Sequence, residues 1–266
     1  MSDLLAFFGL KAYPFDKQIK ACAAVETAPF AECLARLEFL KRRGGIMLLT
    51  GDPGVGKTIA LRRFADSVND NLFRPIYTPL TTLRGTDLLR HLNDKLGLAQ
   101  RASKGVVYRQ IQQELLDSRE QRGKTVVLII DEAHLLQVGP LHELRLLTNF
   151  KMDSFDPFIL VLCGQSDLRR VMDFSVMEPL SQRLAFRYHM PPLEPPETAT
   201  YVTALMKLAG AREPIFKDDA LAALHELSFG IPRRIGTMAE DALTAAMFAG
   251  KRTVDADLVL TIKQGA

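Results

Sequence analysis

The stretch Gly51-Asp52-Pro53-Gly54-Val55-Gly56-Lys57-Thr58 decides the fold of this chain. It has the form G-x-x-x-x-G-K-T, which builds a phosphate-binding loop when a strand precedes it and a helix follows it. The apolar run at 46–49 predicts a buried strand, and residues 59–65 suit a helix. The stretch therefore predicts a loop that binds the phosphates of a nucleotide.

The loop also predicts which atoms meet the nucleotide. Its backbone N–H groups and the dipole of the following helix attract phosphate oxygens. We expect Lys57 to reach the β- and γ-phosphates and the Thr58 hydroxyl to hold Mg²⁺, so the expected cofactors are ATP and Mg²⁺. The predicted nucleotide-binding residues of this segment are Gly51, Asp52, Pro53, Gly54, Val55, Gly56, Lys57, Thr58 and Ile59.

The rest of the chain divides at a proline-rich segment, 191–196. Before it, apolar runs alternate with helical periods, which favours a parallel sheet covered on both faces. After it, every segment has helical spacing. We predict an α/β domain over 1–190, beginning with an irregular leader at 1–30, and a small all-helical lid domain over 191–266. Strands are expected at 46–49, 74–78, 125–130, 158–163 and 184–190.

An acidic pair, Asp131-Glu132, directly follows the buried run at 125–130. Ligands bind at the carboxyl ends of parallel strands. Asp131 is suited to hold Mg²⁺, and Glu132 to polarise the attacking water. An acidic strand end can also cap the next helix, but the phosphate loop makes the catalytic interpretation the stronger one.

Further polar residues are candidates for a hydrolysis site. Gln165, after the run at 158–163, could orient the attacking water, with Asn149 as the alternative. Arg183 could reach a nucleotide on a neighbouring subunit, with Arg187 as the alternative.

The helical part contributes one more basic candidate. The segment Gly230-Ile231-Pro232-Arg233-Arg234 opens a helix, where the helix dipole disfavours cations. We therefore expect Arg233, or alternatively Arg234, to bind the γ-phosphate and couple nucleotide state to the lid.

Composition sets wider limits. The 266 residues carry a net charge of +3 and are 47% hydrophobic, an ordinary globular balance. The three cysteines lack C-x-x-C spacing, which favours a reducing compartment. Because the N-terminus has no signal-peptide pattern and the apolar runs are short, we expect a cytoplasmic protein without membrane insertion.

On these residues the chain resembles the AAA+ ATPases over essentially its whole length. Within that superfamily it is similar to the ExeA/GspA-type and TniB-type ATPases, and also to the transposition regulators MuB, IstB and TnsC. The resemblance implies a P-loop NTPase fold with a five-stranded sheet and a helical lid. The residues that carry it, besides the phosphate loop, are the segments 7–15, 131–134, 144–150, 164–165 and 230–234.

The resemblance to transposition regulators also implies a function. It implies an ATPase stimulated by DNA and by oligomerisation, which forms a homo-oligomeric ring or filament on double-stranded DNA and recruits or activates a transposase. The predicted DNA contacts are Thr82, Arg84, Arg101 and Lys104, because hydroxyls and cations near glycines suit the phosphate backbone.

Two other functions stay open at this point. One is a cytoplasmic ATPase module of a secretion or envelope-assembly system. ExeA-type proteins continue into a membrane segment that this sequence, ending at Ala266, does not contain, so we expect the transposition role. The other is a nucleotide-gated scaffold with negligible turnover.

Overall fold

The computed structural model describes residues 4–16, 25–79 and 85–264. The chain forms two compact units. The α/β unit contains Glu32–Gly51 and Ala60–Met190, and the helical unit contains Met1–Ala31, Asp52–Ile59 and Pro191–Ala266. The phosphate loop from Asp52 onward thus groups with the helical residues, although it continues the chain from a strand of the α/β unit.

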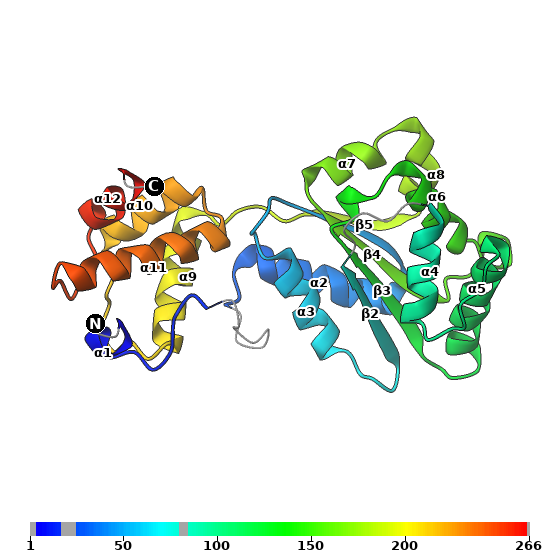
Figure 1. Cartoon of the computed structure of the whole chain (residues 1–266), viewed down its shortest axis with the longest axis horizontal. Helices are drawn as coiled ribbons and strands as arrows, with labels where there is room; N and C mark the ends of the chain where they lie inside the picture. Colours follow the sequence, from blue (N-terminus) through cyan, green and yellow to red (C-terminus); the bar gives the residue numbers. More distant parts are fainter. Residues whose placement is uncertain (1–3, 17–24, 80–84, 265–266) are drawn as a thin grey trace. The chain divides into compact units, whose positions relative to one another are not determined.

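A parallel sheet of five strands forms the centre of the α/β unit, as predicted (Figure 1). The strand order is β2-β3-β4-β1-β5. The strands span Gly45–Thr50 (β1), Phe73–Pro79 (β2), Thr125–Asp131 (β3), Phe158–Gly164 (β4) and Leu184–His189 (β5).

The register of the central strands positions the site. Every residue of β3 and of β4 is buried, which explains why both appear as unbroken apolar runs in the sequence. Val126 pairs with Phe158, and Ile130 pairs with Leu162. The carboxyl ends of the two strands therefore lie side by side at one edge of the sheet.

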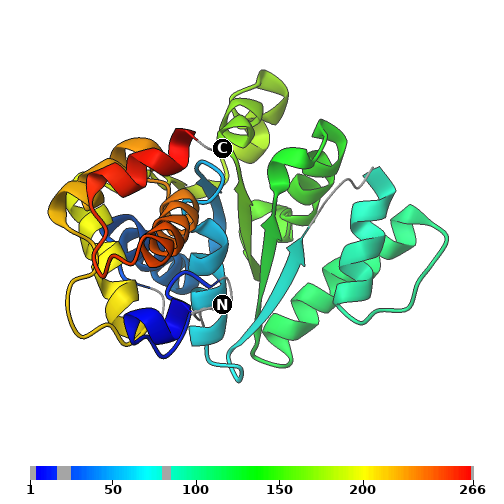
Figure 2. The ribbon, with the colours of Figure 1, turned by 60° about the vertical axis from the view of Figure 1, so that its left-hand side comes forward.

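Helices cover both faces of this sheet, as predicted (Figures 1 and 2). One face carries α2 and the part of α3 within this unit, and the other carries α4, α5 and α6. The helices of the unit span Ala28–Arg43 (α2), Lys57–Ser67 (α3), Gly85–Lys95 (α4), Lys104–Glu120 (α5), Val138–Leu147 (α6), Ser166–Met172 (α7) and Glu178–Ser181 (α8), of which α2 and α3 extend into the other unit.

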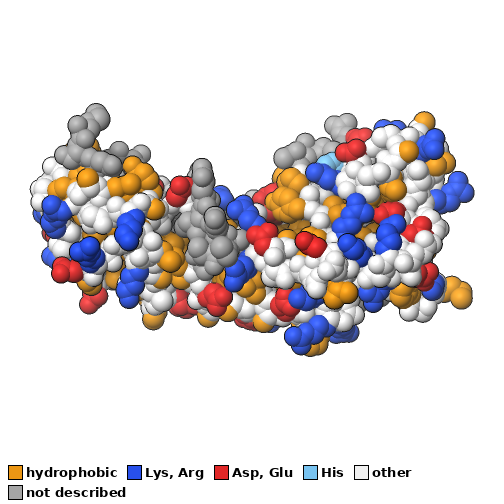
Figure 3. All heavy atoms as spheres, turned by 90° about the horizontal axis from the view of Figure 1, so that it is seen from below, with side chains coloured by type: hydrophobic (Ala, Val, Ile, Leu, Met, Phe, Trp, Pro, Cys, Tyr) orange, Lys and Arg blue, Asp and Glu red, His pale blue; other side chains and the backbone are white. Residues whose placement is uncertain are grey.

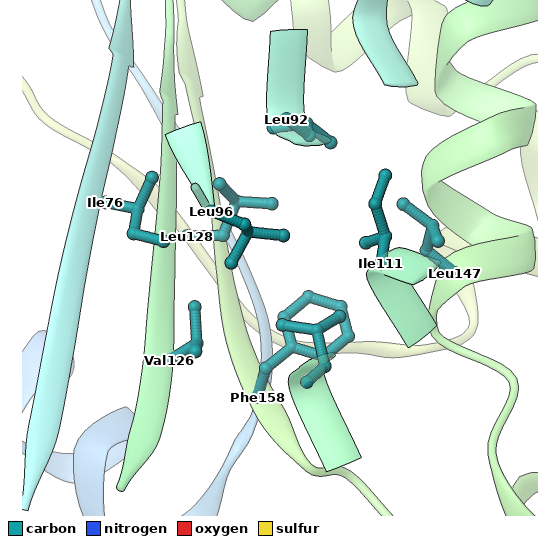
Figure 4. A pocket seen from close by; sticks show the side chains of 9 residues that line it. Ile76, Leu92, Leu96, Ile111, Val126, Leu128, Leu147 and Phe158 are labelled. Carbon is teal, nitrogen blue, oxygen red and sulfur yellow. The ribbon is translucent and has the colours of Figure 1, made fainter. Parts of the chain in front are cut away.

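A small cavity lies in the core between the sheet and α4, α5 and α6 (Figure 4). Its lining consists of apolar side chains, among them Ile76, Leu128 and Phe158 from three strands and Leu92 and Ile111 from two helices. With no polar group to orient a ligand, this space belongs to the packing of the core rather than to a nucleotide site.

The helical unit contains α1 (Leu4–Phe8), α9 (Pro195–Leu208), α10 (Asp218–Ser228), α11 (Pro232–Phe248) and α12 (Ala256–Gln264). Its core includes Leu4 and Leu10 from the N-terminal leader beside helical residues such as Leu224 and Leu243. The Lys11 N–H donates to the Ala209 carbonyl at 2.7 Å.

The leader contains a short helix, α1, where the sequence indicated irregular structure, and its residues Leu4 and Leu10 belong to the core of the helical unit. Within the described ranges, no helix combines the length and the apolar character that crossing a membrane requires.

Candidate nucleotide-binding and hydrolysis site

The phosphate loop has the backbone conformation that the motif requires. Gly54 and Gly56 have φ values of +92° and +111°, which side-chain-bearing residues rarely adopt. Lys57 is the first residue of α3, is buried, and donates from Nζ to the Asp52 carbonyl at 2.9 Å. The ammonium is therefore held at the loop and at the positive end of a helix dipole, a suitable place to receive phosphate.

The loop contacts the start of α11 within the helical unit. The Arg233 N–H donates to the Gly54 carbonyl at 3.2 Å. A Cβ added to Gly54 would lie 2.8 Å from the Arg233 Cβ and 3.2 Å from the Ile231 Cγ2. Arg233, the first of the two candidate arginines, therefore contacts the loop through its backbone. The guanidinium of the alternative, Arg234, lies over the Phe229 ring.

In the α/β unit, Asp131 ends β3 with its carboxylate fixed at both oxygens. Oδ1 accepts the Glu132 N–H at 2.9 Å, and Oδ2 accepts the Tyr77 hydroxyl at 2.9 Å. Glu132 itself has a left-handed backbone, with φ 56° and ψ 30°. Asp131 is only 2% exposed, so a buried carboxylate stands at the sheet edge where the sequence placed it.

Tyr77 was missed by the sequence reasoning. Burial raises the pKa of its hydroxyl well above the ordinary value, and the Asp131 carboxylate raises it further. The hydroxyl therefore keeps its proton and remains a donor. The available signal was an aromatic hydroxyl near the end of a strand, but its significance depends on β2 pairing with β3.

The His134 ring lies between Glu132 and the end of β4. The Glu132 Oε2 lies 3.5 Å from the His134 Nδ1, and the Gln165 N–H points to the same nitrogen at 3.4 Å. A Cβ on Gly164 would lie 3.0 Å from the His134 backbone nitrogen, so the two strand ends approach closely. Gln165 is thus near Glu132, whereas the exposed Asn149 follows α6 and offers its carbonyl to Gln112 of α5.

The two candidate arginines near β5 both make contacts within the α/β unit. Arg183 is partly buried and donates from Nη1 to the Thr148 hydroxyl at 2.8 Å. The exposed Arg187 donates to the Ser181 carbonyl and lies 3.5 Å from an Asp173 carboxylate oxygen. Arg183 is therefore held beside the end of α6, and Arg187 in a surface ion pair.

The predicted DNA contacts are less clearly placed. Thr82 and Arg84 lie outside the described residues. Arg101 is exposed, and Lys104 forms an ion pair with Glu143 of α6. On the face in Figure 3, lysine and arginine side chains lie among aspartates and glutamates, so this view does not mark out a purely basic surface.

A comparison with known families identifies the domain. Residues 40–172, which include the phosphate loop and the Asp131-Glu132 pair, match a family described as AAA domain. The chain belongs to the AAA domain family.

Two relatives share sequence with this AAA domain chain. It is 34% identical over 252 residues to the general secretion pathway protein A of Aeromonas hydrophila, which covers 93% of the chain and 46% of that protein. It is 30% identical over 147 residues to the FluMu DNA transposition protein B of a Mu-like prophage in Haemophilus influenzae, which covers 55% of the chain and 48% of that protein. The chain thus spans about half the length of each relative.

Solved structures support the fold. The Cdc6p structure from Pyrobaculum aerophilum superposes with a TM-score of 0.69 at 17% identity, over 91% of this chain and 67% of that one. The likeness extends past residues 40–172, which match the AAA domain family, and into the helical residues, so the sheet and the helical region each have a counterpart in that structure.

The residues of this AAA domain suit the nucleotide and the Mg²⁺ that the family implies. The left-handed glycines and Lys57 suit phosphate oxygens. Among the described residues no group of three or more His, Cys, Asp or Glu side chains gathers as a metal site. Mg²⁺ is usually held by one or two carboxylates together with substrate phosphates, and Asp131 offers one such carboxylate.

Proposed function

We propose that this chain binds ATP with Mg²⁺ and hydrolyses it. The observation that carries the proposal is the left-handed phosphate loop with Lys57 at its end and Arg233 against Gly54. Lys57 would bind the β- and γ-phosphates, and Arg233 the γ-phosphate. Thr58 and Asp131 would each offer an oxygen to Mg²⁺, which when bound neutralises charge on the phosphate oxygens.

The remaining site residues would complete hydrolysis. Glu132 would polarise the attacking water, and Gln165, which like Glu132 lies near the His134 ring, would help to orient that water. Arg183 would act on the nucleotide of a neighbouring copy, where a cation stabilises the charge of the transition state. A neighbour that completes the site would make turnover depend on oligomerisation.

We further propose that the oligomer forms on double-stranded DNA in the cytoplasm and serves a transposase. The support is the similarity to a DNA transposition protein B over 147 residues. Arg101, exposed next to α5, would contribute to backbone contacts together with Thr82, Arg84 and Lys104. Such contacts hold a duplex without selecting a sequence.

A second function has its own support. The similarity to a general secretion pathway protein A extends over 252 residues, more of the chain than the transposition match covers. In this alternative the same ATPase cycle drives a partner in an envelope machine, and duplex DNA has no role.

Duplex binding separates the two. Purified protein with a non-hydrolysable ATP analogue is titrated onto a labelled duplex by fluorescence anisotropy, at low and at physiological salt. The transposition role predicts ATP-dependent binding that weakens steeply with salt, and filaments or rings by electron microscopy. Lys57→Ala is the control, because it should lose nucleotide binding and with it the ATP dependence.

The outcomes are distinct. Absence of duplex binding at low salt, in protein that binds and hydrolyses ATP, would contradict the DNA role and favour the secretion alternative. Normal nucleotide affinity in Lys57→Ala would contradict the site itself. A turnover that is equal in the wild type and in Glu132→Gln would favour a nucleotide-gated scaffold over an ATPase.

A further inference from the structure

Tyr77 is notable among the tyrosines because its hydroxyl donates a hydrogen bond to Asp131, the carboxylate that we propose holds Mg²⁺. It is a residue of β2, two positions before the strand ends, and pairs with Ile129 of β3. Asp131 lies two residues beyond Ile129 in β3. Because side chains alternate between the two faces along a strand, the side chains of Tyr77 and Asp131 lie on the same face of the sheet. The Tyr77 ring spans the two-residue offset between Tyr77 and Asp131, and its hydroxyl donates to the Asp131 Oδ2 at 2.9 Å.

A buried carboxylate needs such donors. Burying a charge without hydrogen bonds is costly, and Asp131 is almost completely buried. The Glu132 N–H donates to Oδ1 and so holds one of the two carboxylate oxygens. The Tyr77 hydroxyl bonds the other oxygen and thereby fixes the plane of the group.

The hydroxyl leaves the carboxylate able to serve a cation. Each carboxylate oxygen has two lone-pair sites, and the Tyr77 hydroxyl takes one of those on Oδ2. Tyr77 can therefore hold Asp131 in place while Asp131 accepts hydrogen bonds from metal-bound water or approaches the metal directly.

We propose that Tyr77 is a positioning residue that orients Asp131 for Mg²⁺ and so sets how strongly Mg²⁺ tightens nucleotide binding. This rests on the proposed ATP site. Groups that orient a metal ligand typically change metal affinity about 10- to 100-fold when they are removed. Tyr77 acts through Asp131 and has no direct role in the chemical step.

Tyr77→Phe tests this because it removes only the hydroxyl and keeps the ring. The affinity for a fluorescent ADP analogue is measured in excess EDTA and again in excess Mg²⁺, with no turnover involved. We expect the affinity in EDTA to stay unchanged and the affinity in Mg²⁺ to fall about tenfold. Tyr108→Phe is the matched control, because the Tyr108 hydroxyl donates to the Leu146 carbonyl instead.

Several results would overturn the proposal. Mg²⁺-dependent affinity that is unchanged or tighter in Tyr77→Phe would show that the hydroxyl does not orient Asp131, or that it competes with the metal. Equal losses with and without Mg²⁺ would indicate a merely structural role. Nucleotide binding by the wild type that ignores Mg²⁺ would contradict this inference alone, whereas no nucleotide binding at all would contradict the proposed function as well.

Discussion

Replacing Gly54 with alanine tests whether the phosphate loop depends on its contact with α11. At φ +92° a side-chain-bearing residue is strained by about 1–2 kcal/mol. The new Cβ would also lie 2.8 Å from the Arg233 Cβ, which is rigidly attached to backbone and cannot swing away. Overpacking of this kind costs about 1–3 kcal/mol. The two effects together disfavour the observed loop by about 2–5 kcal/mol.

That strain acts directly on nucleotide binding. Because ATP requires the loop in its observed conformation, the lower limit of about 2 kcal/mol weakens binding about 30-fold. Isothermal titration calorimetry with a non-hydrolysable ATP analogue and Mg²⁺ measures the change. Thermal unfolding of the same samples shows whether the variant remains folded.

Two other glycines provide matched controls. Gly97 has φ +78° but no heavy atom within 4 Å of an added Cβ, so Gly97→Ala has the backbone strain without the contact. Gly139 lies within α6, also with open space, and alanine there should stabilise the helix by up to about 1 kcal/mol. Both should keep wild-type nucleotide affinity. Affinity in Gly54→Ala within threefold of the wild type, or an equal loss in Gly97→Ala, would refute the reasoning.

Three further predictions concern other residues. Glu132→Gln should keep ATP binding and lower turnover at least about 100-fold in a phosphate-release assay; undiminished turnover would remove Glu132 as the base. Arg183→Ala should bind ATP normally, but at high protein concentration it should hydrolyse ATP about 10³-fold more slowly than the wild type. A wild-type rate per subunit that does not fall on dilution would exclude an action of Arg183 on a neighbouring copy. Burial raises the pKa of the Cys33 thiol from 9.0 to about 12. The contribution of the Cys33 thiol to the free energy of unfolding is therefore complete below pH 9 and is lost as the pH rises from 9 to about 12. Iodoacetamide at pH 8.5 should label Cys33 only in unfolded protein, and fast labelling of native protein, read by mass spectrometry, would contradict the burial.

The sheet could be predicted from the sequence because its central strands are buried on both faces. The run predicted at 125–130 became β3 at Thr125–Asp131, and the run predicted at 158–163 became β4 at Phe158–Gly164. Both have neighbours on either side in the sheet, so nearly every position must be apolar, and the pattern is strong. The acidic pair could be assigned because it follows such a run in a chain that also carries the phosphate loop, since an acidic strand end alone could equally cap the next helix.

Contacts that join distant segments could not be predicted in the same way. The leader has no periodicity of its own, and its partners lie about two hundred residues or more away, at Ala209 and in α10 and α11. Tyr77 becomes informative only once β2 is known to pair with β3 in a particular register. The boundary placed near residue 190 stays a prediction about domains, although the contacts group the leader and part of the phosphate loop with the helical residues.

The glycine at position 54 connects two motifs that the sequence presents separately. In the form G-x-x-x-x-G-K-T this position is unrestricted, so phosphate binding alone does not explain it. The structure does, because Gly54 is left-handed and lies against Ile231 and Arg233. Gly230, just before them, is left-handed too, and a Cβ there would lie 2.1 Å from the Leu193 carbonyl oxygen. Gly230 allows the chain to turn just before α11 begins at Pro232, and Gly54 allows the phosphate loop to contact that helix. A shift of this loop must therefore move the start of α11 or break the Arg233–Gly54 hydrogen bond, and in the proposed function this contact is how the helical unit would respond to a bound nucleotide.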